Sequence, residues 1–223
     1  MMKPSYSYEG QDRIAFSLLR SIKKGNYIDI GANHPILNNN TYLFYEKLWT
    51  GLAIDGNNEF NNLWKDKRPN DIFINELISD DIKEANFEIY KDKEISSIDY
   101  ETQIRYRSRI LDKDEIKSKK IKTNTLTNIL KQINFTNKEI HLLSIDVEGE
   151  DFNVLKGLDF NLFQPGLIII ENKNYSINKT CENKIADFLK LKDYVLISKT
   201  PLDSFFINPN KKYFNWLPEK LRS

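Results

Sequence analysis

The sequence predicts an α/β fold built on a doubly wound, mostly parallel sheet. Four apolar runs predict its core: Tyr27–Ile30, Leu52–Ile54, the run that ends before Asp146, and Gly166–Ile170. None of them alternates cleanly between apolar and polar side chains, so each strand is expected to be covered on both faces. Segments with a helical apolar pattern separate several of the runs, an order typical of parallel strands joined by crossover helices.

The first part of the chain is expected to supply an N-terminal helix and three core strands. Apolar side chains recur at helical spacing in the segments assigned to helices. Short apolar runs bounded by turn residues mark the strands. In order, the predicted elements are a helix over 11–22, a strand over Tyr27–Ile30, a helix over Thr41–Leu48, a strand over Leu52–Ile54, a short helix over Asn58–Lys65 and a strand over Asp71–Asn75.

Residues 81–122 are expected to form an excursion from the core sheet. Ala85–Tyr90 alternates polar and apolar side chains and predicts an additional strand, with Ser96–Ser97 in the loop that follows. The segment Arg105–Lys122 holds eight basic and three acidic residues and few large apolar ones. It is interpreted as a solvated loop, and it could also be a lid over a binding site. Three of its arginines could bind phosphate: Arg105, Arg107 and Arg109.

The last part of the chain is expected to end the sheet in an antiparallel edge. A short helix over Phe152–Leu158 precedes the fourth apolar run, and Ile185–Leu191 predicts a further helix. Two strands then follow closely, Tyr194–Ser198 and Ser204–Ile207, and could pair with each other. The apolar tail is interpreted as a packing anchor or a dimer contact: Tyr213, Phe214, Trp216 and Leu217.

The turn after the first strand limits the kind of nucleotide that could bind. Gly31 permits a backbone geometry that a side chain would hinder. A pyrophosphate site needs two further glycines, and Asn33 and Ile36 stand in their places. An adenosine cofactor without phosphates, such as S-adenosylmethionine (SAM), fits this pattern better. The alternative is an ordinary strand–turn–helix unit without a ligand.

Acidic residues end the first two strands. Asp55 lies 26 residues after Asp29, which leaves room for a turn, a crossover helix and a return strand. An acid at the end of the second strand is well placed to accept hydrogen bonds from ribose hydroxyls.

Four segments together resemble one family. They read YIDIGAN at 27–33, TNTLTNIL at 123–130, LLSIDVEGEDFNVLKGLDF at 142–160 and PGLIIIEN at 165–172. They are similar to the FkbM family of SAM-dependent methyltransferases, over about residues 25–172. The resemblance implies a class I methyltransferase fold in a single domain, 1–223. The sequence departs from the family at His34-Pro35, where a glycine is common, and at Asp55-Gly56-Asn57, where Glu-Pro is common.

The resemblance also implies roles for residues around the cofactor. Gly31 and Asn33 would contact the methionine part of SAM, and Asp29 would orient the turn or accept from its ammonium group. Asp55 would hold the ribose. Ser79 and Asp80 fall where the family holds the adenine, although the same residues also favour turns.

Acids at the ends of later strands suggest the chemistry of methyl transfer. A hydroxyl acceptor must lose its proton, to a general base or with help from a metal. Asp146, Glu171 and Asn172 would be oxygen ligands for Mg²⁺ or Mn²⁺, or they could organise loops instead. The base that often follows the first acid in related enzymes is replaced by Gly149. The candidates for catalysis are therefore Asp146, Glu148, Glu150 and His34.

Charge, cysteine content and hydropathy limit the classes of partner and site that the protein is expected to have. The formal charge of +1 over 223 residues disfavours binding to a long nucleic acid through overall electrostatics. Cys181 is the single cysteine, which excludes an internal disulfide and a cysteine-rich zinc site. There is no secretory signal pattern and no apolar run of membrane-spanning length, so a cytoplasmic enzyme without membrane insertion is expected.

The function expected from these observations is O-methylation of a carbohydrate hydroxyl, on a sugar nucleotide or a surface-polysaccharide precursor. One alternative is a methyltransferase for a non-sugar small molecule. The other is a noncatalytic nucleotide-binding module, which the acids at four strand ends disfavour.

Overall fold

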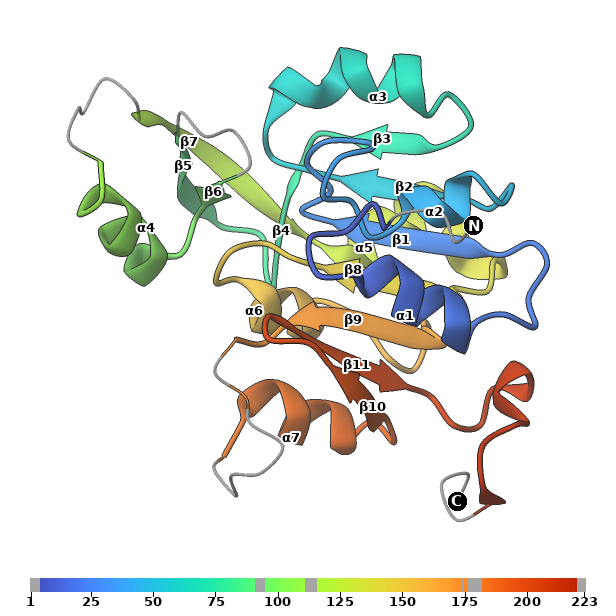
Figure 1. Cartoon of the computed structure of the whole chain (residues 1–223). Coiled ribbons are helices and arrows are strands. Elements are labelled where there is room, and N and C mark those ends of the chain that lie inside the picture. The colour runs from blue at the N-terminus through green and yellow to red at the C-terminus, as the bar shows by residue number, and fades with distance from the viewer. Residues whose placement is uncertain (1–4, 91–94, 111–115, 174, 176–181, 220–223) are drawn as a thin grey trace.

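The fold is known from a computed structural model that describes residues 5–90, 95–110, 116–173, 175 and 182–219 (Figure 1). Cys181 lies outside these residues. Within them, seven strands form the main sheet in the order β10-β11-β9-β8-β1-β2-β3. The strands are β1 (Asn26–Ile30), β2 (Thr50–Ile54), β3 (Ile72–Ile74), β8 (Leu142–Ile145), β9 (Leu167–Glu171), β10 (Val195–Lys199) and β11 (Asp203–Ile207).

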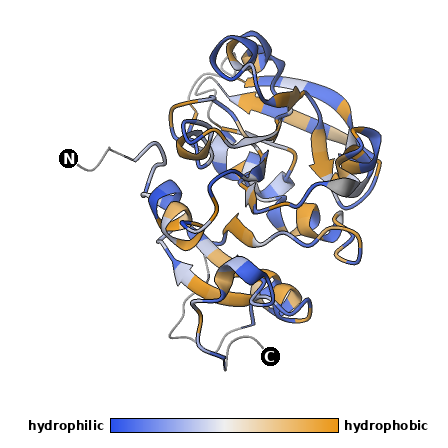
Figure 2. Ribbon diagram, turned by 90° about the vertical axis from the view of Figure 1, so that its right-hand side faces the viewer, coloured by the Kyte–Doolittle hydropathy of each residue, from blue (hydrophilic) through white to orange (hydrophobic). Residues whose placement is uncertain are grey.

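The pairing of the strands confirms the predicted doubly wound sheet with an antiparallel C-terminal edge. β1, β2, β3, β8 and β9 run parallel to one another. β11 is antiparallel to β9, and β10 is antiparallel to β11. The core strands are predominantly apolar, which agrees with burial on both faces (Figure 2).

Helices cover both faces of the sheet because successive side chains of each strand point to opposite sides. Ile28 and Ile168 belong to one apolar cluster with α5 (Leu126–Gln132), α6 (Asp151–Lys156) and α7 (Lys184–Lys190). Tyr27 and Ile169 belong to a second cluster with α1 (Gln11–Leu18) and α2 (Tyr42–Tyr45). A short 3₁₀ turn, η1 (Asn58–Phe60), leads into α3 (Asn61–Lys67), which packs beside β2.

Several predicted boundaries are corrected. The first helix ends at Leu18 and not at residue 22, and the helix expected over Thr41–Leu48 is the short α2. The apolar tail contains a 3₁₀ turn, η4 (Lys212–Phe214). Phe214 and Leu217 are buried in the cluster with α1, which confirms the packing interpretation for these two residues.

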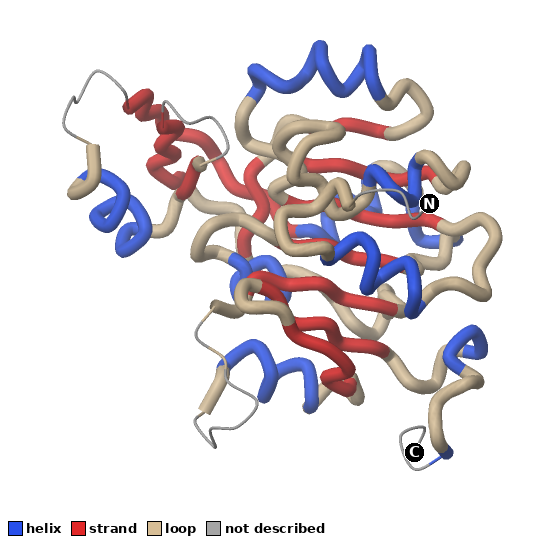
Figure 3. The backbone as a smooth tube through the Cα atoms, in the orientation of Figure 1, coloured by secondary structure: helices blue, strands red, loops and turns tan. Residues whose placement is uncertain are grey.

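The excursion supplies three strands of a second sheet, together with one strand that precedes it (Figure 3). Its order is β4-β7-β5-β6, from β4 (Leu77–Ser79), β5 (Glu84–Tyr90), β6 (Ser96–Ser97) and β7 (Ile116–Thr125), with α4 (Tyr100–Arg107) beside it. The predicted strand at 85–90 is confirmed as β5. The loop predicted over Arg105–Lys122 is wrong where α4 and β7 lie, and the loop predicted at Ser96–Ser97 is wrong because these residues form β6.

The charged strand β7 forms because its backbone pairs with two neighbours. It is parallel to β4 and antiparallel to β5 along the whole length of β5. One side chain of β7, Ile121, packs against the small cluster of Leu77, Phe87 and Ile89. The ammonium of Lys119 lies 5.6 Å from the ring centre of Phe87, so its aliphatic stem can cover apolar surface.

The lengths of the helices show whether any of them could span a membrane. Among the described residues, the longest helices are α1 and α4, with eight residues each, and none is long and apolar enough to cross a bilayer. A spanning helix needs about 20 residues.

Candidate active site

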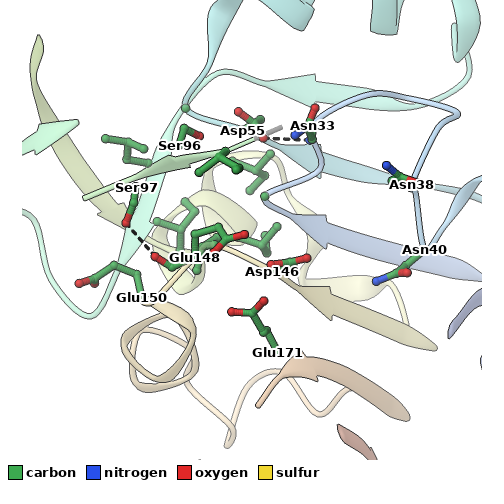
Figure 4. Close-up of a pocket in the computed structure, with 18 of the residues that line it drawn as sticks. Asn33, Asn38, Asn40, Asp55, Ser96, Ser97, Asp146, Glu148, Glu150 and Glu171 are labelled. Atoms are coloured by element: carbon green, nitrogen blue, oxygen red, sulfur yellow. Dashed lines mark hydrogen bonds between the residues drawn. The ribbon is translucent and has the colours of Figure 1, made fainter. Parts of the chain in front are cut away.

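A pocket of about 260 Å³ opens at the carboxyl ends of the parallel strands (Figure 4). Residues from the ends of β1 and β2 line one part of it, including Gly31, Asn33 and Asp55. Residues that follow β8 and end β9 line another part. The segment Ile95–Ile98 of the excursion closes the pocket from a third direction. This is the position at which open α/β sheets bind their ligands.

Gly31 is required where the ends of β1 and β8 meet. Its φ is +74°, and a Cβ atom added there would lie 1.8 Å from the carbonyl oxygen of Asp146. The N–H groups of Gly31 and Ala32 both donate to the carbonyl of Ile54, at 2.9 and 3.1 Å. The turn therefore ties β1 to β2 while it touches the backbone that leaves β8.

Asn33 and Asp55 are joined by a hydrogen bond in the part of the pocket that the ends of β1 and β2 line. The N–H of Asn33 donates to Asp55 Oδ2 at 2.9 Å, and the N–H of Asn57 donates to Asp55 Oδ1 at 2.7 Å. Burial raises the pKa of Asp55 to about 6. The Oδ1 atom of Asn33 is buried and finds no hydrogen-bond donor among the described residues. A bound ligand could supply that donor.

Asp29 lies beneath the loop after Gly31 and does not line the pocket. Its Oδ2 atom accepts from the hydroxyl of Thr41 at 2.7 Å and from the amide of Asn39 at 3.1 Å. Burial raises the pKa of Asp29, although the guanidinium of Arg68 opposes that shift. Of the two predicted roles, the structure supports orientation of the turn.

Arg68 fixes the same loop from the other side. Its side chain is buried and donates to Asp71 at 2.7 Å, to Asn39 at 3.0 Å and to the carbonyl of Pro35 at 3.2 Å. The second terminal nitrogen donates to Tyr27 and Thr41. Sequence analysis did not single out this arginine, because a surface position is the usual expectation for arginine.

Three other predicted residues lie away from the pocket lining. Ser79 donates to Glu150 at 2.9 Å, and Asp80 pairs with Lys156 at 2.6 Å, so both face α6. Residues 76–78, directly before them, line the pocket. His34, a predicted candidate for catalysis, has its Nδ1 turned to its own loop, where it accepts from the backbone N–H groups of Ile36 and Leu37 at 3.1 and 2.9 Å.

Three carboxylates gather on the other side of the pocket. Asp146, Glu148 and Glu171 each present an oxygen within 4.8 Å of the others. Figure 4 shows the side chains of Asp146 and Glu171 pointing toward one another. Asn172 does not join them, because its amide exchanges hydrogen bonds with Asn183 at 2.9 and 3.1 Å. The predicted ligand pair Asp146 and Glu171 is therefore brought together with Glu148 and without Asn172.

Lys173, which sequence analysis missed, lies among these carboxylates. Its ammonium is 2.5 Å from Glu171 and 3.5 Å from Glu148. Burial alone would lower the pKa of Lys173, but the hydrogen bond and charge of Glu171 and the charge of Glu148 raise it above its ordinary value. The Lys173 side chain is therefore positively charged and stays among these carboxylates. Its position two residues after Glu171 is the only signal that the sequence carries.

The excursion positions Glu148. The Ser97 hydroxyl donates to the Glu148 carbonyl at 2.7 Å, and the Tyr106 hydroxyl donates to its carboxylate at 3.3 Å. Gly149 has φ +108°, and an added Cβ would lie 2.8 Å from both Asp99 Cβ and Thr102 Oγ1. The loop after β8 and the start of α4 therefore meet at a point where only glycine fits.

Asp151 supports the same loop from below. It is buried at the start of α6 and accepts from the N–H groups of Val147 and Gly149, both at 3.2 Å. Burial and the nearby charge of Glu171 raise the pKa of Asp151 to about 8. Glu150 accepts from Ser79 and Asn153, so its carboxylate is also held by protein donors.

Asp146 differs from Glu148 and Glu171, whose carboxylates have partners among the described residues. No described residue donates a hydrogen bond to its carboxylate or forms an ion pair with it. Its side chain is exposed and opens into the pocket. Desolvation by the protein around it and the charge of Glu171 raise the pKa of Asp146 well above its usual value. Such a carboxylate accepts a proton more readily than an ordinary one does.

We expect Gly31→Ala to destabilise the protein by several kcal/mol, because the new methyl group would overlap the Asp146 backbone. Gly10→Ala is the matched control: its φ is +84°, but no atom lies within 4 Å of the added Cβ. It should cost about 1–2 kcal/mol, from backbone strain alone. Urea unfolding of both variants measures the difference, and equal losses would contradict the close approach of β1 and β8.

We expect stability to fall by about 1 kcal/mol between pH 7 and 8.5. An acid with a raised pKa binds its proton more tightly in the folded state, so stability is lost as pH rises through that pKa. Asp151, at about 8, titrates in this range. The pKa of His141 is lowered mainly by burial, so this histidine titrates below the range from pH 7 to 8.5. Asp151→Asn should flatten the dependence in urea unfolding, and an unchanged slope would refute the assignment.

Comparison with known proteins places these features in a family. The Methyltransferase FkbM domain matches residues 29–196, which include the Gly31 turn, the excursion and the carboxylates of β8 and β9. A search of curated proteins and a search of solved structures each gave no match. The match covers most of the chain, and the mostly parallel seven-stranded sheet with antiparallel C-terminal strands is that of class I methyltransferases. The chain therefore belongs to the FkbM family of SAM-dependent methyltransferases.

Proposed function

We propose that the protein methylates a hydroxyl group of a carbohydrate, on a sugar nucleotide or a surface-polysaccharide precursor. The observation that carries the proposal is the two-sided pocket. Asn33 and Asp55 lie on one side, and the unpaired carboxylate of Asp146 lies on the other, with Gly31 at the contact between them. This arrangement would place a cofactor beside a group that can take a proton.

The residues on the first side fit SAM. Gly31 lines the pocket where the methionine part would lie. The Oδ1 atom of Asn33, which accepts no hydrogen bond from any described residue, would accept one from its ammonium group. Asp55 keeps lone pairs for ribose hydroxyls after accepting from two backbone N–H groups. Ser79 and Asp80 stay predictions for binding the adenine. Residues 76–78 are closer candidates for that role, because they line the pocket.

The residues on the second side would handle the acceptor. When bound, SAM supplies a methyl group whose bond to sulfur breaks as a bond to the acceptor oxygen forms, the electron pair leaving with sulfur. Asp146 is proposed to take the hydroxyl proton, with Glu148 as the second candidate. His34 is a weaker candidate, because its Nδ1 accepts from the loop backbone. The excursion would help to exclude water and to hold the acceptor in line.

A site for a divalent cation is proposed as a separate point, and the methyl transfer proposed above does not depend on it. Asp146, Glu148 and Glu171 would offer oxygen ligands of the kind that Mg²⁺ and Mn²⁺ prefer. Lys173 already lies among these oxygens, so a metal would compete with its ammonium. Two other functions stay open. They are methylation of a non-sugar small molecule and a noncatalytic role.

Calorimetric titration with SAM tests the cofactor site, with EDTA present and then with Mg²⁺ or Mn²⁺. We expect Asp55→Ala to weaken SAM binding about tenfold or more, through the loss of ribose hydrogen bonds. Asp146→Ala should bind SAM nearly as well and lose methyl transfer once an acceptor is found. Asp66→Ala, at an exposed position of α3, is the matched control. Unchanged affinity in Asp55→Ala would rule out the ribose assignment, and no SAM binding by the wild-type protein would favour the noncatalytic role.

A further inference from the structure

One wall of the pocket has no part in the cofactor and proton-transfer roles proposed above. This N-terminal wall consists of five uncharged residues of the pocket lining: Tyr8, Gln11, Leu37, Asn38 and Asn40. Hydrogen bonds join its two segments. The N–H of Asn39 donates to the carbonyl of Tyr6 at 3.0 Å, and the Ser7 hydroxyl donates to the carbonyl of Asn39 at 3.5 Å. The segment before α1 therefore lies beside the loop after β1.

The backbone around Tyr8 is held in place, but the Tyr8 side chain has no partner. Before it, Ser7 Oγ accepts from the N–H of Asp12 at 2.9 Å, and after it, the N–H of Glu9 donates to Gln11 Oε1 at 2.8 Å. No hydrogen bond or ring contact joins the Tyr8 side chain to another described residue. Tyr8 is 75% exposed. The fold thus presents an uncovered aromatic ring at the pocket.

An apolar side chain and amide groups lie in the same wall. Of the large apolar and aromatic side chains that are exposed in the described part of the chain, only Tyr8 and Leu37 line the pocket. Asn40 donates to Ser144 Oγ at 3.1 Å, and no described residue donates to its own carbonyl oxygen. Figure 4 shows Asn40 and Ser97 on opposite sides of Asp146, so the wall and the excursion flank this carboxylate.

An aromatic ring beside amide groups suits a sugar ring. One face of a pyranose carries C–H groups that pack on the face of an aromatic ring, while its hydroxyls form hydrogen bonds with amides. Ligand sites combine aromatic surface with a few placed polar groups in this way. The wall is uncharged, and the acid beside it, Asp203, already accepts from the Gln11 amide at 2.6 Å. A planar aromatic acceptor would also stack on Tyr8 but would leave the amides unused.

We propose that Tyr8 stacks against a pyranose ring of the acceptor and that the Asn40 carbonyl oxygen accepts from one of its hydroxyls. This inference rests on the function proposed above and assigns a sugar subsite within the same pocket. The ring would lie beside Asp146, so that another of its hydroxyls could face the methyl donor. Tyr8 would select the acceptor and take no part in proton transfer.

Binding of simple glycosides tests the inference. The protein is saturated with S-adenosylhomocysteine, and the methyl pyranosides of glucose, galactose, mannose, rhamnose and fucose are titrated separately by saturation-transfer NMR, with phenol as an aromatic probe. We expect at least one glycoside to bind saturably, with the strongest transfer to the C–H groups of one ring face. Tyr8→Ala should weaken that binding about tenfold, because the ring face is no longer covered.

Two variants serve as controls. Tyr8→Phe keeps the aromatic ring and should bind the glycoside within about twofold of the wild-type protein. Tyr100→Ala removes a ring that is 70% exposed on α4 and does not line the pocket, so it should leave binding unchanged. The affinity for S-adenosylhomocysteine is measured first in every variant and should equal that of the wild-type protein, which shows that the fold and the cofactor site are intact.

The outcomes separate the sugar subsite from the function on which it rests. No saturable binding of any glycoside, or equal binding by Tyr8→Ala and Tyr100→Ala, would overturn the subsite. Phenol binding that is tighter than that of every glycoside and is lost in Tyr8→Ala would also overturn it, in favour of an aromatic acceptor. Weaker S-adenosylhomocysteine binding in Tyr8→Ala alone would place Tyr8 in the cofactor site instead. Failure of the wild-type protein to bind S-adenosylhomocysteine would overturn the methyltransferase site itself.

Discussion

The buried guanidinium of Arg68 is the constraint on which the loop after β1, and so one wall of the pocket, depends. A buried charge is costly unless its donors are satisfied, and Arg68 makes five hydrogen bonds, to β1, to the loop after it and to Asp71. Its guanidinium also lies 4.3 Å from the ring centre of Trp64, whose indole N–H donates to the Asn33 carbonyl. The loop from Asn33 to Thr41 is therefore fixed by packing in the protein itself.

The two halves of the pocket are joined at glycines. Gly31 lets the end of β1 touch the backbone of Asp146, and Gly149 lets the loop after β8 approach the excursion. The first of these contacts brings Asp146, which follows β8, next to the turn that follows β1. The excursion then adds hydrogen bonds from Ser97 and Tyr106 to Glu148, so a segment outside the core sheet helps to build the carboxylate cluster.

Much of the fold could be predicted because its core strands are continuous apolar runs, and acids at their ends necessarily gather at one edge. Other features could not. Strand β7 is rich in lysine and forms through backbone pairing, which composition does not report. Glu171 and Asn172 are neighbours in an extended segment and point to opposite sides, so both could not face one cluster. His34 bends back to its own loop, and the ion pair of Lys173 with Glu148 depends on the loop after β8, which is distant in sequence.

The central claim is that one pocket holds SAM between Asp55 and Asp146. A crystal structure with S-adenosylhomocysteine tests it most directly. We expect the ribose hydroxyls within hydrogen-bond distance of Asp55, the amino acid part against Gly31 and Asn33, and the sulfur facing the space in front of Asp146. A ligand bound elsewhere, or bound here with Asp55 out of reach of the ribose, would contradict the account.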